Sequence, residues 1–339
     1  MPTLRTGIDS KMRIGHGSIR AISLLLLVLA TLSGCRGGAP PPSIPAGPLE
    51  GERHRVIFLH DNDHHFHRNF PDQVEAWIQA VRGSEERVYL VNAGDVLVRH
   101  RDRWPEGADE VWYRDRGREL VRWMNHLGYD AMTLGNHDLF AIGGSTREIM
   151  DEAAFPLLSA NVTVDTPYLP DPEPYIVLPG SSGDPSIVLV GLSVTNSQDG
   201  VALVQRDPIE VAGEYRHLAE SHDAVVFLTH IGHRVDLELA QAHPWVAAIL
   251  GGHSHTLVPQ AIRENGVLVA QAGGHPHVER PDAPMWMGTV VLEFVNGQLV
   301  GGCGWVVEID AAGVRIAGGE DGVEGSISPD DVVRCPVAA

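Results

Sequence analysis

Seven short apolar segments alternate with amphipathic ones along the chain, and this alternation constrains the fold more than any other feature of the sequence. Their Val, Ile and Leu content predicts strands over residues 55–60, 87–91, 130–134, 186–192, 224–228, 246–250 and 266–270. The spacing of apolar residues between them predicts helices over residues 72–82, 116–127, 211–222 and 235–243. Strands that are apolar along their whole length are buried on both faces, so we expect an α/β protein whose sheets are covered by helices. A closing antiparallel hairpin is expected over residues 287–294 and 298–309, around the turn Asn296-Gly297.

A polar cluster follows directly on each of five predicted strands. In chain order the clusters are Asp61-Asn62-Asp63-His64-His65, Asn92-Ala93-Gly94-Asp95, Gly135-Asn136-His137-Asp138, Thr229-His230-Ile231-Gly232-His233 and Gly251-Gly252-His253-Ser254-His255. Each cluster alone is typical of an ordinary polar turn. In an α/β sheet, however, the carboxyl ends of the strands meet at one edge, so the five clusters are expected to converge. Asp, Asn and His are ligands of zinc, manganese and iron, so the sequence predicts a metal site there.

The five clusters together resemble the motifs of the calcineurin-like metallophosphoesterases, in particular their 5'-nucleotidase branch. That branch typically carries H-T-N-D-x-H, G-D, G-N-H-E-F-D, T-H-x-G and G-G-H-S-H. The counterparts here begin at His60, Gly94, Gly135, Thr229 and Gly251, and the likeness extends over residues 56–294. It implies a catalytic domain over residues 55–310 with the metallo-dependent phosphatase fold, a four-layer α/β/β/α sandwich of two mixed sheets flanked by helices.

The resemblance also implies the chemistry of the site. Two divalent metal ions (manganese, zinc or iron) would be held by two overlapping ligand sets: Asp63, His65, Asp95 and His255 for one ion, and Asp95, Asn136, His230 and His253 for the other. Such a pair activates a water and stabilises charge on phosphoryl oxygens. His137, next to the ligand Asn136, would donate to a phosphate oxygen or to the leaving group. The implied function is hydrolysis of phosphoesters, either nucleotides or other small phosphorylated compounds.

The chain departs from the family pattern at two places. The acid that closes G-N-H-E-F-D orients the catalytic His in the 5'-nucleotidase pattern, and Phe140 stands at that position here. We expect Asp138 to be a structural acid of the motif rather than its replacement. Second, about 45 residues follow position 294, too few for the nucleobase-binding domain of 5'-nucleotidases, so nucleotide specificity does not follow from the resemblance.

Two segments near the motifs supply candidate substrate contacts. Arg99 and Arg101 lie in a basic run before Trp104, where either a solvated loop or an anion clamp is expected. His275 and His277 follow Gly273-Gly274, where the family loop borders the site, so both are candidate contacts and solvated residues are the alternative.

The N-terminus has the pattern of a bacterial lipoprotein signal. Basic residues precede an apolar run of about a dozen residues, which is too short for a comfortable membrane span. The run ends Leu32-Ser33-Gly34-Cys35, which resembles a lipobox. We therefore expect a signal peptide over residues 1–34 (starting at Met1 or Met12), a lipid on Cys35 and a Gly/Pro-rich tether over residues 35–54. An ordinary signal peptide or a buried helix is the alternative.

This reading predicts a lipid-anchored protein of the cell envelope, in the periplasm or at the cell surface. Arg36 rather than Asp after the lipidated Cys favours the outer membrane. In an oxidising compartment Cys303 and Cys335 favour one disulfide, which would tie the acidic, Gly-rich tail of residues 311–339 to the domain; free buried thiols are the alternative.

A formal net charge of −19 leaves no basic surface for a nucleic acid polymer, so none is expected as a partner. The resemblance implies a small phosphorylated substrate, and we expect a monomer. Two other functions stay open at the sequence level. One is thiosulfate-ester hydrolysis on a carrier protein, and the other is a non-catalytic metal-binding surface lipoprotein.

Overall fold

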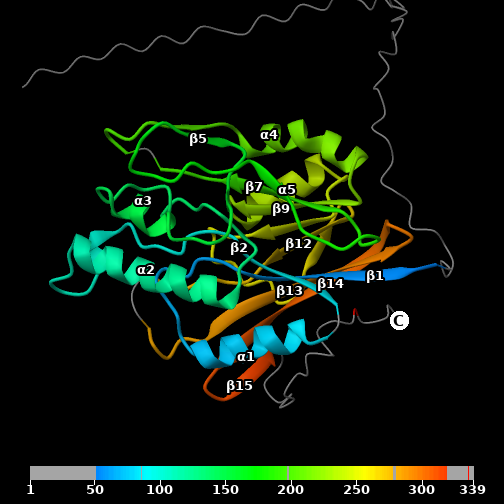
Figure 1. Ribbon diagram of the computed structural model, residues 1–339, viewed down its shortest axis with the longest axis horizontal. Coiled ribbons are helices and arrows are strands. Elements are labelled where there is room, and N and C mark those ends of the chain that lie inside the picture. The colour runs from blue at the N-terminus through cyan, green and yellow to red at the C-terminus, as the bar shows by residue number, and fades with distance from the viewer. Residues whose placement is uncertain (1–50, 85, 197, 278–279, 319–334, 336–339) are drawn as a thin grey trace, which may run out of the picture. The chain divides into compact units, whose positions relative to one another are not determined.

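The computed structural model describes residues 51–84, 86–196, 198–277, 280–318 and 335 (Figure 1). The predicted signal segment, Cys35 and most of the predicted tether and tail lie outside these ranges. Within them, no helix has both the length and the apolar character needed to cross a membrane.

A seven-stranded mixed sheet carries the first half of the site. Its order is β15-β14-β13-β1-β2-β3-β4, with β1 (Arg53–Asp61), β2 (Arg87–Asn92), β3 (Ala131–Thr133), β4 (Leu157–Leu158), β13 (Met285–Val295), β14 (Gln298–Asp310) and β15 (Gly313–Ile316). Strands β1 to β4 are parallel, whereas β13 pairs antiparallel with β1 and continues into the hairpin with β14. The hairpin turns at Asn296 and Gly297, both of which have positive φ, as predicted from that dipeptide.

A six-stranded mixed sheet carries the second half. Its order is β11-β12-β10-β9-β7-β6, with β6 (Tyr175–Val177), β7 (Ile187–Ser193), β9 (Ala224–His230), β10 (Ala248–Gly251), β11 (Ile262–Glu264) and β12 (Val267–Gln271). The four central strands are parallel, and the two edge strands are antiparallel to them. A small two-stranded sheet pairs β5 (Val162–Val164) with β8 (Leu203–Gln205).

Helices cover the outer faces of both large sheets. They are α1 (Pro71–Arg82), α2 (Glu110–Leu127), α3 (Ser145–Met150), α4 (Pro208–Glu214) and α5 (His233–Ala242), with 3-10 turns η1 (Arg101–Arg103) and η2 (Tyr215–Glu220). Figure 1 shows α1 and α2 on one side of the sheets and α4 and α5 on the other.

Three apolar cores hold these layers together. Leu59 of β1 lies in one core with Trp77 of α1 and Met124 of α2. A second core lies between the sheets and contains Phe58 and Val290 of the first sheet with Leu189 and Leu228 of the second. In the third core, Val190 of β7 lies with Val211 of α4 and Leu239 of α5. The α/β/β/α order implied by the resemblance is therefore confirmed.

Two predicted helices differ from the structure by more than two residues, whereas α1 and α5 agree with the prediction within two residues at each end. Helix α2 begins at Glu110 rather than at 116, because the side chain of Asp109 accepts hydrogen bonds from the N–H groups of Val111 and Trp112 and so caps an earlier turn. The predicted helix over residues 211–222 is divided into α4 and the 3-10 turn η2, which begins at Tyr215. Near the C-terminus, Cys303 of β14 and Cys335 form a disulfide, with 5.5 Å between their Cα atoms.

Candidate metal centre

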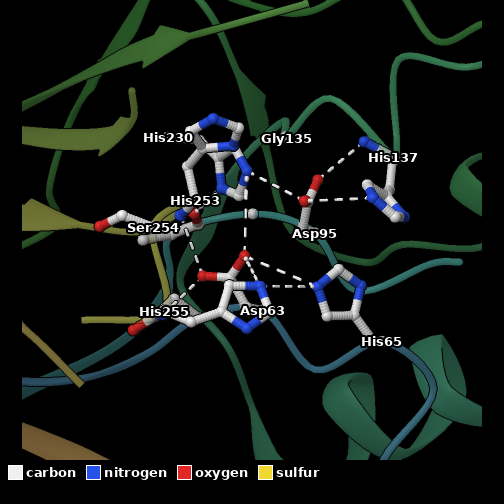
Figure 2. Close-up of polar contacts among 12 residues, drawn as sticks. Asp63, His65, Asp95, Gly135, His137, His230, His253, Ser254 and His255 are labelled. Atoms are coloured by element: carbon white, nitrogen blue, oxygen red, sulfur yellow. Dashed lines mark hydrogen bonds and ion pairs between the residues drawn. The ribbon is translucent and has the colours of Figure 1, made fainter. Parts of the chain in front are cut away.

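The polar clusters lie at the carboxyl ends of parallel strands from both large sheets. In chain order, Asp63 and His65 follow β1, Asp95 follows β2, Asn136 and His137 follow β3, His230 ends β9, and His253 and His255 follow β10. The face-to-face packing of the sheets brings these ends together, and Figure 2 shows the labelled aspartate and histidine side chains gathered around one point. The polar clusters therefore converge in the structure, as their positions at strand ends predict.

Two groups of metal-ligand side chains form within this convergence. One contains Asp63, His65 and His255, the other Asp95, His230 and His253, and the ligand atoms within each group lie within 4.8 Å of one another. Asp63 Oδ1 is 3.2 Å from His255 Nε2 in its own group and 4.0 Å from His230 Nε2 in the other. The two groups are therefore adjacent.

An unusual backbone conformation aims these side chains. Five of the seven predicted ligands have φ between 45° and 77°, in the left-handed region: Asp63, His65, Asp95, His253 and His255. This region is strained for residues with a Cβ atom, and such strain concentrates at functional sites. The close approach of two clusters also requires Gly135, because a Cβ atom there would lie 2.1 Å from Asp95 Oδ1.

Hydrogen bonds behind the rings of His65 and His230 leave one nitrogen of each in position to bind a metal. Nδ1 of His65 lies 3.0 Å from the carbonyl oxygen of Leu97, and Nδ1 of His230 lies 2.7 Å from that of Ala93. Since a carbonyl only accepts, both Nδ1 atoms donate, so in the neutral form of each ring Nε2 carries the lone pair. This is the usual support of a metal-binding histidine.

The buried polar atoms without hydrogen bonds test whether the residues fit a metal. Asp63 Oδ1, Asn136 Oδ1 and His230 Nε2 are buried and make no hydrogen bond with any described residue. The ion-pair contacts of Asp63 Oδ1 and His230 Nε2 at 3.2 Å or less are with His255 and Asp95, which are themselves predicted ligands. Buried polar atoms are otherwise almost always paired, and all three are atoms that ligate divalent transition metals. The donor set therefore fits the metals that the sequence predicts.

The electrostatics of the site favour a cation. Burial disfavours the charged form of His230, but Asp95 and Asp63 outweigh burial and raise its pKa to about 10. Burial likewise opposes ionisation of Asp95, yet His230 and His137 hold the pKa of its carboxyl well below the usual range. Two buried carboxylates thus create a negative field at the point where the imidazoles converge.

His137 differs from the ligand histidines in its supporting hydrogen bond. Its Nδ1 accepts a hydrogen bond from the main-chain N–H of Arg99 at 3.2 Å, so the proton of the neutral ring is on Nε2. Nε2 lies 4.0 Å from Asp95 Oδ2. The backbone amide of Arg99 therefore orients the His137 ring. Phe140, which stands where the family has the orienting acid, packs under the guanidinium of Arg99, whose Cζ atom lies 5.5 Å from the centroid of the Phe140 ring.

Asp138 and Asn62, which both lie within the polar clusters of the sequence, support the loops that carry the predicted ligands. Asp138 accepts hydrogen bonds from the N–H groups of Gly135, Asp95 and Leu97, so it fixes the loops after β2 and β3 as the structural acid that we expected. Burial and the nearby Asp95 raise its pKa to about 7. Asn62, which sequence reasoning missed as a separate element, donates to Asp63 Oδ2 at 2.6 Å and to the carbonyl of Gly273 at 2.5 Å.

The candidate substrate contacts take three different positions. Arg99 is half-buried beside His137, whereas Arg101 is exposed, lies over Trp104 and contacts Glu110. His275 is buried, with its ring stacked 4.8 Å from that of His67.

His277 lies closer to the ligand rings than His275 does, 4.2 Å from the ring centroid of His65. Its nitrogen joins those of His65 and His137 in a further group within 4.8 Å. The only signal for it in the sequence is its position after the Gly273-Gly274 loop.

Comparison with known proteins agrees with this geometry. Residues 57–257 match the family described as calcineurin-like phosphoesterase. The chain is 30% identical over 273 residues to the trifunctional nucleotide phosphoesterase protein YfkN of Bacillus subtilis, covering 68% of this chain and 18% of that protein. It is 32% identical over 197 residues to human 5'-nucleotidase, covering 53% of this chain and 32% of that protein.

A solved structure has the same fold. The 5'-nucleotidase precursor from Thermus thermophilus superposes with a TM-score of 0.57 at 25% identity, covering 74% of this chain and 54% of that one. The chain therefore spans a minor part of the two curated relatives and about half of this solved chain. On the match over residues 57–257 and the fold, the chain belongs to the calcineurin-like phosphoesterase family.

Proposed function

We propose that this protein hydrolyses phosphoesters, with two divalent metal ions held at the adjacent ligand groups. The observation that carries the proposal is the pairing of two such groups, Asp63–His65–His255 and Asp95–His230–His253, on one edge of the sandwich. Asn136 would complete the second set, because its Oδ1 is buried and makes no hydrogen bond. Bound there, the cations would supply Lewis acidity toward a water and toward phosphoryl oxygens.

The protein's own groups would orient the substrate. His137 presents Nε2–H beside Asp95, so it would donate a hydrogen bond to a phosphoryl oxygen or to the leaving-group oxygen. The loops that hold the ligands are fixed by Asp138 and Asn62, so the donors are positioned before the substrate binds. Both curated relatives above are named for nucleotide phosphoester chemistry, which supports nucleotides or other small phosphorylated compounds as the substrate class.

The same proposal includes a place in the cell envelope. It rests on the lipobox-like Leu32-Ser33-Gly34-Cys35 and on the disulfide between Cys303 and Cys335, which suits an oxidising compartment. Labelling of the full chain with a radioactive or clickable fatty acid, with Cys35→Ser as the control, tests the anchor independently of the activity.

Hydrolysis of p-nitrophenyl phosphate, its bis-ester and AMP by the manganese-loaded protein tests the activity. We expect turnover that EDTA abolishes and that manganese restores. Asp95→Ala should lose turnover by at least about 10³-fold, because it removes a ligand of the charged centre. If the wild-type protein binds two ions per chain and turns over none of these esters, the non-catalytic metal-binding alternative replaces this proposal.

A further inference from the structure

His277 packs against rings of the candidate metal centre. Its ring centroid lies 4.2 Å from that of His65, 4.7 Å from that of His137 and 5.7 Å from that of His255. The ring of His100 stacks 5.5 Å from it and packs 5.2 Å from the ring of His137. His277 is therefore part of the site, although it lies outside the five sequence motifs.

The loop that carries His277 is fixed to the first ligand loop. The main-chain N–H of His275 donates to the carbonyl of Asp63 at 2.9 Å, and Asn62 Nδ2 donates to the carbonyl of Gly273 at 2.5 Å. At Gly274 a Cβ atom would lie 2.9 Å from the Cβ atom of Asp63, so the two loops are in close contact. The position of His277 relative to the ligands is thus determined by the same hydrogen bonds that hold Asp63.

The group formed by His65, His137 and His277 does not suit a third metal ion. His65 can offer only Nε2, because its Nδ1 donates to Leu97, and that Nε2 already belongs to the group with Asp63 and His255. Nε2 of His137 carries the ring proton, because its Nδ1 accepts from Arg99. A protonated nitrogen cannot ligate a metal, so of these three rings His277 alone has an uncommitted nitrogen.

Donors that converge beside a metal centre suit an oxyanion instead. In either tautomer the neutral ring of His277 carries one N–H group, a ring nitrogen of His277 lies within 4.8 Å of a ring nitrogen of His137, and the two ring centroids are 4.7 Å apart. An oxygen between these two rings could accept from both. We propose that His277 is a substrate-binding residue that, together with His137, donates a hydrogen bond to a phosphoryl oxygen of a phosphate ester. The inference rests on the proposed phosphoester hydrolysis and assigns a residue to its substrate.

Calorimetric titration of the manganese-loaded protein with orthophosphate tests this role without any turnover. His277→Ala should weaken orthophosphate binding roughly tenfold or more, the loss expected for one hydrogen bond to a charged group. His277→Gln, which keeps an N–H donor, should recover part of the affinity. His217→Ala is the matched control, because His217 is exposed and the hydrogen bond of its side chain is to the carbonyl of Glu214, in the 3-10 turn η2. Manganese content and melting temperature are measured for every variant.

Three results would overturn the assignment. The first is unchanged orthophosphate affinity in His277→Ala. The second is loss of a manganese ion from that variant, which would make His277 a metal ligand. The third is no orthophosphate binding by the wild-type protein. Failure of the wider proposal is distinguishable. Orthophosphate binding that depends on His277, in a protein that hydrolyses no ester, would contradict the hydrolase function and leave the assignment of His277 intact.

Discussion

Hydrogen bonds behind the imidazole rings separate two kinds of histidine in the site. His65 and His230 donate Nδ1–H to main-chain carbonyls, so in their neutral forms Nε2 carries the lone pair that a metal ion can take in place of a proton. His137 receives a main-chain N–H at Nδ1, so its Nε2 carries a proton. In the proposed function, the backbone atom that each histidine faces would decide whether its ring binds a cation or donates to an anion.

This difference predicts opposite phenotypes for two alanine variants. His230→Ala removes a lone pair from the ligand set, so it should lose bound manganese together with activity. His137→Ala should keep its manganese and lower kcat by about 10²- to 10³-fold, the range for loss of one preorganised donor to a developing oxyanion. Metal analysis by mass spectrometry and steady-state kinetics on p-nitrophenyl phosphate measure both. Loss of manganese in His137→Ala would mean that His137 is a ligand after all.

The residues of the site were predictable where they follow a strand directly. Asp63, Asp95 and His230 stand at strand ends, so the topology alone brings them together. His277 lies in a loop whose path depends on Asn62 and on the carbonyl of Asp63, contacts that no spacing in the sequence reveals. The orientation of His137 was also unpredictable, because its ring is held by the main-chain N–H of Arg99, a group that every residue except proline has.

At the scale of elements, continuous apolar strands were predicted well and very short ones were missed. Strands β7 and β9 are buried along their whole length and appear in the sequence as unbroken apolar runs. Strands β4, β5, β6, β8 and β11 contain only two or three residues, too few to show a period. They lie at sheet edges or in the small sheet, where pairing with a neighbour rather than an apolar run defines the strand.

Helix α5 is joined to the end of β9 by a buried carboxyl group. Thr229, just before the ligand His230, donates its hydroxyl to Asp236 Oδ1 at 2.6 Å. Burial raises the pKa of Asp236 to about 7. Because the unfolded chain loses this proton near pH 4 and the folded protein keeps it until about pH 7, the group lowers the free energy of unfolding as pH rises through this window.

Asp236→Asn keeps an acceptor for Thr229 and removes the titration. Urea unfolding of the metal-free protein at pH 5 and pH 8 should therefore show a smaller loss of stability with pH in this variant than in the wild type. Glu238→Gln, which changes an exposed carboxylate on the same helix, is the control. Equal pH dependence in Asp236→Asn and the wild type would show that Asp236 is ionised across the whole window.

At the scale of the whole described structure, the ligand groups join the two sheets. Asp63 and His65 follow a strand of the first sheet, whereas His255 follows a strand of the second, and Asp95 and His230 are divided in the same way. Ions bound by these groups would connect loops from both sheets across their common edge. Metal binding is therefore expected to stabilise the sandwich as a unit, since the unfolded chain has no preformed site.

Thermal unfolding with and without metal measures this coupling. At a free manganese concentration about a hundredfold above the dissociation constant, one site adds about 2.7 kcal/mol to the free energy of unfolding. That gain corresponds to a rise in Tm of about 5 °C for a domain of this size. His255→Ala, which removes the ligand supplied by the second sheet to the group with Asp63 and His65, should reduce the rise, and His217→Ala should preserve it. An equal rise in His255→Ala and the wild type would show that the stabilising ion does not need the second sheet, and EDTA should return every metal-loaded variant to its metal-free Tm.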